Sequence, residues 1–174
     1  MSAEQNIKLL CETVVHFNEE GLNKFQYSRE DLYQQWTGNF ITAMKQSANN
    51  MFSDKQSGQM ANALINALKR VAIDTRATDE ESKVQVIVNG LDMEKDFSDK
   101  NIKLDVEFGS TQEEIVAAIT KAMVKKFNNL KLSKTTVFVV DCEYNEEADF
   151  WMPKNMQAFF DTLSASVMGS NQSA

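Results

Sequence analysis

The residues with the clearest potential for chemistry lie in one short run, VFVVDCEYNEEADFW, at positions 137–151. A hydrophobic stretch leads into Asp141 and Glu143, which are one residue apart and would share a face of an extended strand. Paired carboxylates at a strand end are suitable ligands for Mg²⁺ or Mn²⁺. Further acids follow at Glu146, Glu147 and Asp149. The run therefore indicates either half of a metal site or an exposed acidic surface.

This strand end resembles the first motif of DEDD-type exonucleases, in which two strand carboxylates hold a divalent metal. The resemblance implies a small metal-dependent nuclease or phosphohydrolase with Asp141 and Glu143 as ligands of Mg or Mn. It covers a short motif only, because that family also has further acidic motifs and a helix-borne His or Tyr downstream. Here Asp149 and Asp161 are the downstream aspartates, and the single histidine, His16, precedes the motif. The metal-dependent enzyme is therefore the alternative interpretation.

Charge is segregated along the second half of the chain. Residues 121–134 contain lysines and no acid, whereas residues 141–149 contain five acids and no base. Lysines near the end of a helix are favoured by the helix dipole. Carboxylates crowded into a loop repel one another, and such crowding is retained where a cation, a basic protein surface or another copy's lysines dock. We therefore predict a protein-binding surface that uses Asp141, Glu143, Glu146, Glu147, Asp149, Lys121, Lys125 and Lys126.

Composition narrows the class of protein. A chain of 174 residues with 43% hydrophobic and 25% charged residues can bury a core of its own. Its net charge of −7 argues against a general nucleic-acid binder, because such proteins neutralise phosphates with Lys and Arg. No apolar run approaches the roughly 20 residues of a membrane helix, and the N-terminus lacks the basic region of a signal peptide. We expect a cytoplasmic (or host-cytoplasmic) protein without a membrane partner, of phage or mobile-element composition.

The remaining reactive residues do not form a known catalytic motif. Cys11 and Cys142 lie far apart in the sequence, and with His16 as the single histidine no Cys/His zinc set can be assembled. The two thiols are interpreted as buried and reduced. No cofactor is predicted. The favoured interpretation is a non-enzymatic interaction factor of the accessory, assembly, inhibitor or immunity type, whose partner is another protein or its own copies.

Hydrophobic periodicity predicts about three amphipathic helices within residues 1–76. The first helix carries an apolar stripe and stops near Gly21. The second begins after Ser28, a good N-cap residue. The third runs over residues 59–74. Their apolar stripes are predicted to face the core and consist of Ile7, Leu10, Val14, Phe17, Leu32, Trp36, Phe40, Met44, Ala48, Met60, Leu64, Leu68 and Val71.

Residues 83–168 change period and predict a ββαβα order. Strands are expected at 83–91, 102–108 and 135–144, with a helix at 110–130 opened by a capping box of Ser110 and Glu113. A last helix would begin at Pro153. The strands on either side of the 110–130 helix would be parallel through a crossover.

The predicted fold class is α+β, in which the N-terminal helices pack on a small mixed three-stranded sheet. Polar residues 74–82 form the candidate boundary between the segments 1–76 and 83–168. The two segments are expected to form one compact domain, with a frayed tail at 169–174.

Overall fold

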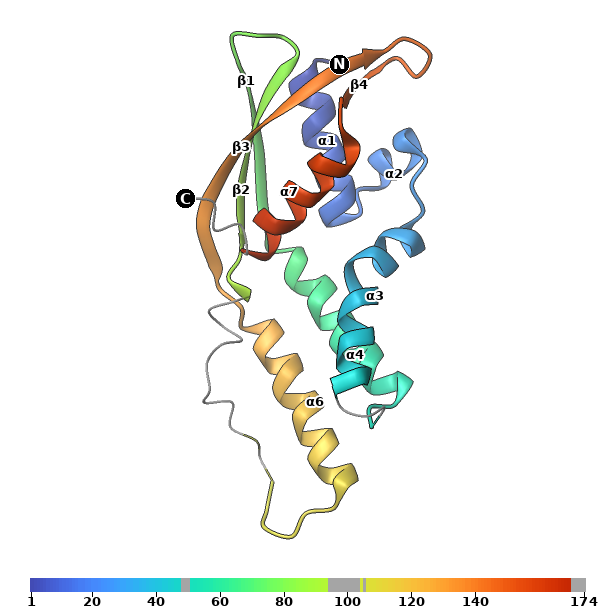
Figure 1. Ribbon diagram of the computed structural model, residues 1–174, viewed down its shortest axis with the longest axis vertical. Coiled ribbons are helices and arrows are strands. Elements are labelled where there is room, and N and C mark those ends of the chain that lie inside the picture. The colour runs from blue at the N-terminus through green and yellow to red at the C-terminus, as the bar shows by residue number, and fades with distance from the viewer. Residues whose placement is uncertain (48–50, 94–103, 105, 170–174) are drawn as a thin grey trace.

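The computed structural model describes residues 1–47, 51–93, 104 and 106–169 and has an α+β fold (Figure 1). The helices of this part of the chain precede, interrupt and follow a single antiparallel sheet. The elements are α1 (Ala3–His16), α2 (Glu19–Phe25), α3 (Arg29–Ser47), α4 (Asp54–Leu68), β1 (Ala72–Ala77), β2 (Lys83–Leu91), α6 (Gln112–Asn128), β3 (Leu132–Asn145), β4 (Phe150–Pro153) and α7 (Met156–Met168).

The sheet has four strands in the order β1-β2-β3-β4, and every neighbouring pair is antiparallel. The prediction of a mixed three-stranded sheet with a parallel crossover was therefore wrong. Two strands, β1 and β4, were not expected. The predicted strand 102–108 lies partly outside the described residues, and its described members, Leu104 and Val106 to Phe108, are exposed and outside any strand.

The predicted boundary at 74–82 is structured differently. It contains the second half of β1 and the turn that connects β1 to β2, so the segment 1–76 is not wholly helical. Arg76 pairs with Gln85 across this hairpin. The polar residues of this stretch belong to a mostly exposed strand and to the turn that follows it. Its composition is therefore similar to that of a linker.

Local capping explains where the helices begin and end. The first predicted helix is two helices: α1 ends at His16, followed by Phe17 in the left-handed region (φ 55°), and Asn18 caps α2. Gly21 lies inside α2 and is buried. The N-cap prediction for Ser28 is confirmed, because its hydroxyl accepts from the Asp31 N–H at 2.9 Å. Four helices therefore precede the sheet instead of about three.

Two later boundaries moved by a few residues. The capping box of α6 uses Thr111 and Glu114, one residue beyond the predicted Ser110 and Glu113. Pro153 ends β4, and α7 begins three residues later with Asn155 as its N-cap. A proline fits here because it stands at the end of a short outer strand, where one ladder donor fewer is tolerated.

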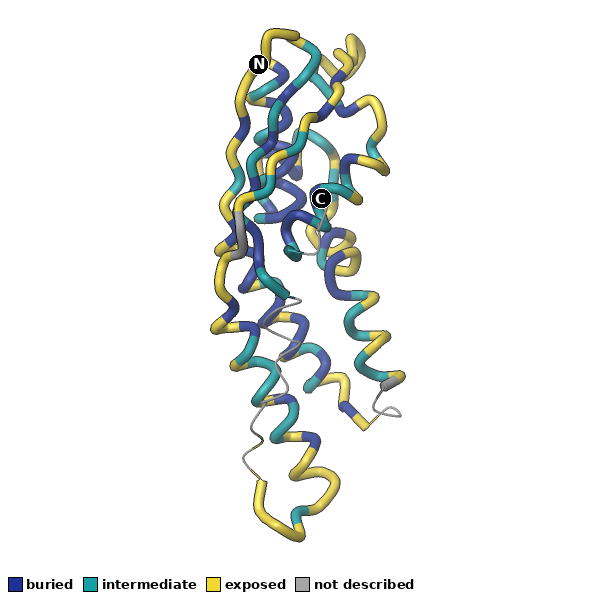
Figure 2. The backbone as a smooth tube through the Cα atoms, turned by 60° about the vertical axis from the view of Figure 1, so that its left-hand side comes forward, coloured by how far each residue is buried: buried dark blue, intermediate teal, exposed yellow. Residues whose placement is uncertain are grey.

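One face of the sheet is buried beneath α1 and α7, while the other face is turned outward (Figures 1 and 2). The buried face carries Val84, Val86 and Val88 of β2, each at most 1% exposed. On β3 it carries Val140 and Cys142. This alternation is that of an antiparallel sheet with one covered face.

Gly90 sets how closely α7 approaches β2. A Cβ at this position would collide with the carbonyl oxygens of Ser166 and Val167 in the last turn of α7. Backbone of a packed helix cannot move aside as a flexible side chain can. The absence of a side chain at Gly90 is therefore a condition for the contact of α7 with the sheet.

We predict that Gly90→Ala lowers the free energy of unfolding by about 1–3 kcal/mol, the usual cost of overpacking. The matched control is Gly58→Ala in α4, where an added Cβ meets nothing within 4 Å. That change should instead stabilise the chain by about 0.5–1 kcal/mol, because alanine is the better helix former. Denaturant unfolding of both variants measures the difference, and equal midpoints for the two would contradict the packing argument.

Candidate functional site: an acidic end of the sheet

The strand end singled out in the sequence lies at the C-terminal end of β3. Asp141 and Glu143 are exposed, whereas Cys142 between them is 1% exposed and points into the core. The two carboxylates therefore share the outer face of the sheet. Burial raises the pKa of the Cys142 thiol to about 11, and the negative charge of Asp141 adds to the effect.

The next acids form the turn between β3 and β4. Asn145 pairs with Phe150, and its side-chain oxygen accepts from the Ala148 N–H at 3.0 Å, which closes the turn. Asp149 occupies the left-handed region (φ 57°), a conformation that aspartate tolerates better than most residues. Tyr144 donates its hydroxyl to the Asp149 carboxylate. This hydrogen bond raises the pKa of Tyr144.

The β3–β4 hairpin is fixed to the N-terminal helices. The side-chain oxygen of Asn6, a fully buried residue of α1, accepts from the Trp151 N–H at 2.8 Å. The rings of Phe25 and Phe150 meet edge to face with centroids 5.1 Å apart. These contacts hold the outer strand β4, which has only a short ladder of its own.

A second acidic turn lies next to the strand end, and it was not recognised in the sequence. The Cys142 N–H donates to the Ser82 carbonyl at 2.6 Å, so the β1–β2 turn lies against β3. The sequence feature that could have indicated this turn is the acidic run Asp79-Glu80-Glu81, which was interpreted only as a polar boundary. Without the hairpin pairing, nothing in the sequence places that run beside residues 62 positions later.

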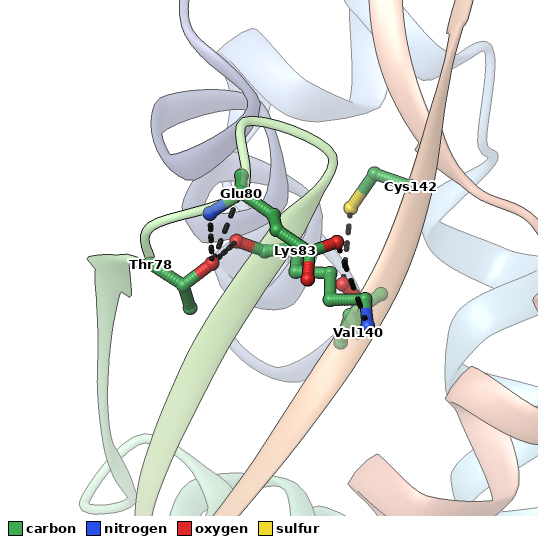
Figure 3. Close-up of polar contacts among 5 residues, drawn as sticks. All are labelled: Thr78, Glu80, Lys83, Val140 and Cys142. Atoms are coloured by element: carbon green, nitrogen blue, oxygen red, sulfur yellow. Dashed lines mark hydrogen bonds and ion pairs between the residues drawn. The ribbon is translucent and has the colours of Figure 1, made fainter.

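Lys83, the first residue of β2, is directed toward the β1–β2 turn (Figure 3). Lys83 lies opposite Asp141 in the β2–β3 register, yet its ammonium nitrogen is 3.6 Å from the Glu80 carboxylate. The single hydroxyl hydrogen of Thr78 is shared between the Glu80 and Lys83 carbonyl oxygens, which lie 2.9 and 2.8 Å from Oγ1, and this contact holds the turn closed. Asp141 therefore lacks the charge partner that strand pairing alone would have given it.

We call the exposed carboxylates of the two turns and the β3 end the acidic end. Within the described residues, Glu80 is its one member that forms an ion pair. Lys154, just after β4, is an exposed base at its margin. The acidic end consists of Asp79, Glu80, Glu81, Asp141, Glu143, Glu146, Glu147 and Asp149.

The predicted lysines are not part of this surface. Lys121, Lys125 and Lys126 lie on α6, which extends from the opposite end of the molecule toward the start of β3 (Figure 1). Lys121 instead lines a cavity of about 550 Å³ between α4 and α6. Most of its other polar lining consists of amides: Gln56, Gln59, Asn62, Asn66 and Asn128. The fold thus keeps the two charge clusters apart.

The metal interpretation has little support from the geometry. Within the described residues, no group of three or more His, Cys, Asp or Glu side chains could hold a metal ion. Asp141 and Glu143 are thus without a third ligand there. Burial also raises the pKa of Cys11, and the Nε2 atom of His16 lies 2.7 Å from the Val71 carbonyl oxygen.

Comparison with known proteins bears on the fold alone. No protein-family model and no curated protein sequence matches this chain. The crystal structure of a putative lipoprotein (ycdA) from Bacillus subtilis is similar, with a TM-score of 0.60 at 12% sequence identity. The similarity covers 95% of this chain and 56% of that one, so this chain spans little more than half of its structural neighbour. None of the helices among the described residues is both long and apolar enough to cross a membrane.

We predict that Asn6→Ala lowers the free energy of unfolding by about 1–3 kcal/mol, because it removes the acceptor of the half-buried Trp151 N–H from a fully buried position of α1. Hydrogen exchange at the Trp151 amide should accelerate with it. The matched control is Asn62→Ala, an exposed asparagine that accepts from Tyr33 at 3.1 Å, where water replaces the lost partner. Equal destabilisation by both changes would show that Asn6 does not anchor β4.

We predict that Asp149→Asn lowers the pKa of Tyr144 toward the ordinary value of about 10. Because the folded-state pKa is raised, this tyrosine contributes stability below its unfolded pKa and loses it as the pH rises through the folded value. An alkaline absorbance titration, with Tyr144→Phe to assign the transition, measures the change. Tyr27, whose pKa is raised by burial, should titrate as before. An unchanged Tyr144 transition would exclude the hydrogen bond as the cause.

Proposed function

We propose that this chain is a non-enzymatic protein-interaction factor and that its acidic end binds a basic surface on a partner protein. The observation that carries the proposal is that two acidic turns and a strand end lie at the same end of the sheet (Figure 1). Tertiary structure gathers these carboxylates from segments distant in sequence. The negative charge at this end of the molecule therefore comes from two hairpins and not from a single run of sequence.

Electrostatics supports a cationic partner. Exposed charges interact over a Debye length of about 8 Å at physiological ionic strength, so carboxylates on neighbouring strands and turns repel one another. With Lys83 directed to Glu80 at 3.6 Å, the carboxylates of β3 lack that local compensation. A partner that brings Lys or Arg side chains removes the repulsion, and such complementarity mainly raises the association rate and the specificity.

Rigidity supports the same role. The β3–β4 turn is closed by Asn145, and β4 is tied to the buried Asn6. The β1–β2 turn is closed by Thr78. A surface whose backbone is fixed before binding loses less conformational entropy when a partner docks.

The test compares two double variants with the same change of charge. Glu146→Gln/Glu147→Gln neutralises the tip of the acidic end, whereas Glu20→Gln/Glu30→Gln neutralises exposed acids on α2 and α3. Binding to an immobilised lysine-rich peptide is measured at low and high salt. Exposed pairs contribute about 0.2–1 kcal/mol each, so the tip variant should bind several-fold more weakly.

The helix variant should bind like the unmodified chain, and the difference between the two variants should shrink as salt is raised. Equal weakening by both variants would mean that the peptide responds to net charge alone. That outcome would contradict a localised docking surface at the acidic end.

A further inference from the structure

A second surface lies on β3, away from the acidic turns. Backbone groups along an antiparallel strand point alternately to its two sides. The Cys142 N–H points toward β2, where it donates to Ser82, and the Asp141 carbonyl points the other way, where it accepts from the Lys154 N–H at 2.8 Å. By the same alternation, Phe138 and Val140 bond to β2. The N–H and C=O groups of Thr135, Val137 and Val139 therefore point away from the sheet.

Among the described residues, no backbone hydrogen bond reaches this side of β3 between Thr135 and Val139. β4 pairs only with Cys142 to Asn145, and Lys154 extends that contact to Asp141. At the other end, the register shifts between the pairs Asn89–Thr135 and Leu91–Leu132, which marks a bulge in β3. Between these limits lies what we call the free edge, the outward backbone groups of Thr135, Val137 and Val139.

The side chains of the free edge are apolar and exposed. Val137 is 50% exposed and Val139 is 55% exposed, although both lie in the middle of a strand. They stand on the outer face of the sheet, where Val137 pairs with Ile87 of β2. Natural sheets usually protect such an edge with lysine, proline or a bulge. Here the protection stops at the two ends of the segment, and its centre remains open.

We propose that two copies of this chain pair through the free edge, as antiparallel strands related by a two-fold axis at Val137. The limits of the free edge select this register, because Val137 is the middle of its three outward residues. Val137 would exchange backbone hydrogen bonds with the partner's Val137, and Thr135 with the partner's Val139. The two sheets would then form one continuous sheet, with Ile87 and Val137 of both copies in one apolar row.

Charge favours a second copy over an arbitrary strand. β3 is preceded by Lys131 and ends in Asp141 and Glu143, so the character of its side chains changes along the strand from basic through apolar to acidic. An antiparallel copy brings the basic start of one strand toward the acidic end of the other, where β4 and Lys154 already occupy the strand edge at Glu143 and Asp141. Such a two-fold interface is self-complementary, as the symmetry of a homodimer requires. This surface is separate from the acidic turns and goes beyond the proposed function.

The first measurement is the mass of the full chain by sedimentation equilibrium over a range of concentrations. We expect a dimer of twice 19.7 kDa. Hydrogen exchange then locates the interface: the Val137 and Val139 amides should become protected as concentration rises, while the Phe138 amide, which faces β2, should not change. A monomer at concentrations up to about 100 μM, where a dimer with a Kd near 10 μM is mostly assembled, would overturn the proposal.

Two variants test the edge itself. Val137→Lys opposes two lysines at the axis and should give a monomer, whereas Gln85→Lys adds the same charge to the same face of the interior strand β2 and should remain a dimer. Val139→Pro removes one outward N–H and should also dissociate the dimer. If that variant does not fold, Val137→Lys decides, with an unchanged far-ultraviolet circular dichroism spectrum as its control for folding, because loss of the dimer itself lowers the melting temperature.

A dimer that survives Val137→Lys would use another surface and would overturn the proposal. So would protection of the Val137 and Val139 amides that is independent of concentration, because some other segment would then cover the edge. Glu146→Gln/Glu147→Gln should leave the dimer intact, since neither residue lies on the free edge. Failure of the acidic surface and failure of the self-pairing are therefore separate results.

Discussion

The antiparallel ladder between β2 and β3 buries Val84, Val86 and Val140 on one face of the sheet. It also fixes which turn lies beside the C-terminal end of β3. Removing those valines from water supplies the driving force for α1 and α7 to cover this face. The same register carries the β1–β2 turn to the side of Cys142. The position of the acidic β1–β2 turn beside the end of β3 therefore depends on the hydrophobic face of this ladder.

The two ends of the molecule are organised by different physical rules. Around the sheet, backbone pairing and buried polar contacts such as Asn6 to Trp151 fix the chain closely. Around α4 and α6, helices pack through Val116 and Met60, while their facing amides leave a water-accessible cavity of about 550 Å³. The charged surfaces follow this division, since the carboxylates lie on turns of the sheet and the lysines on a helix.

Local patterns predicted what short-range physics determines. The stripes of the helices, the period-two alternation of 83–91 and the continuous apolar run in 135–144 identified elements, because burial leaves a direct trace in sequence. β1 was missed because Asp74 and Arg76 on its outward face are charged and the polar Thr75 is its one buried member. β4 was missed because it has four residues, and its Pro153 resembled a helix start.

The candidate site was predictable only in part, for a related reason. Asp141 and Glu143 share a face because adjacent residues of a strand alternate, which a sequence can reveal. The arrival of Asp79 to Glu81 beside them depends on hairpin pairing, which composition does not encode. Lys83 illustrates the limit: strand register places it opposite Asp141, but a three-residue separation lets it reach Glu80 instead.

The burial of Cys142 gives the molecule a native reporter of its own opening. A thiol with a pKa near 11 and 1% exposure reacts with a disulfide reagent only when the end of β3 separates from the core. Cys11, fully buried in α1, reports in the same way on the helical side. The ratio of the two labelling rates would therefore reveal whether the sheet end and the first helix open together or as separate cooperative units, without introducing any probe.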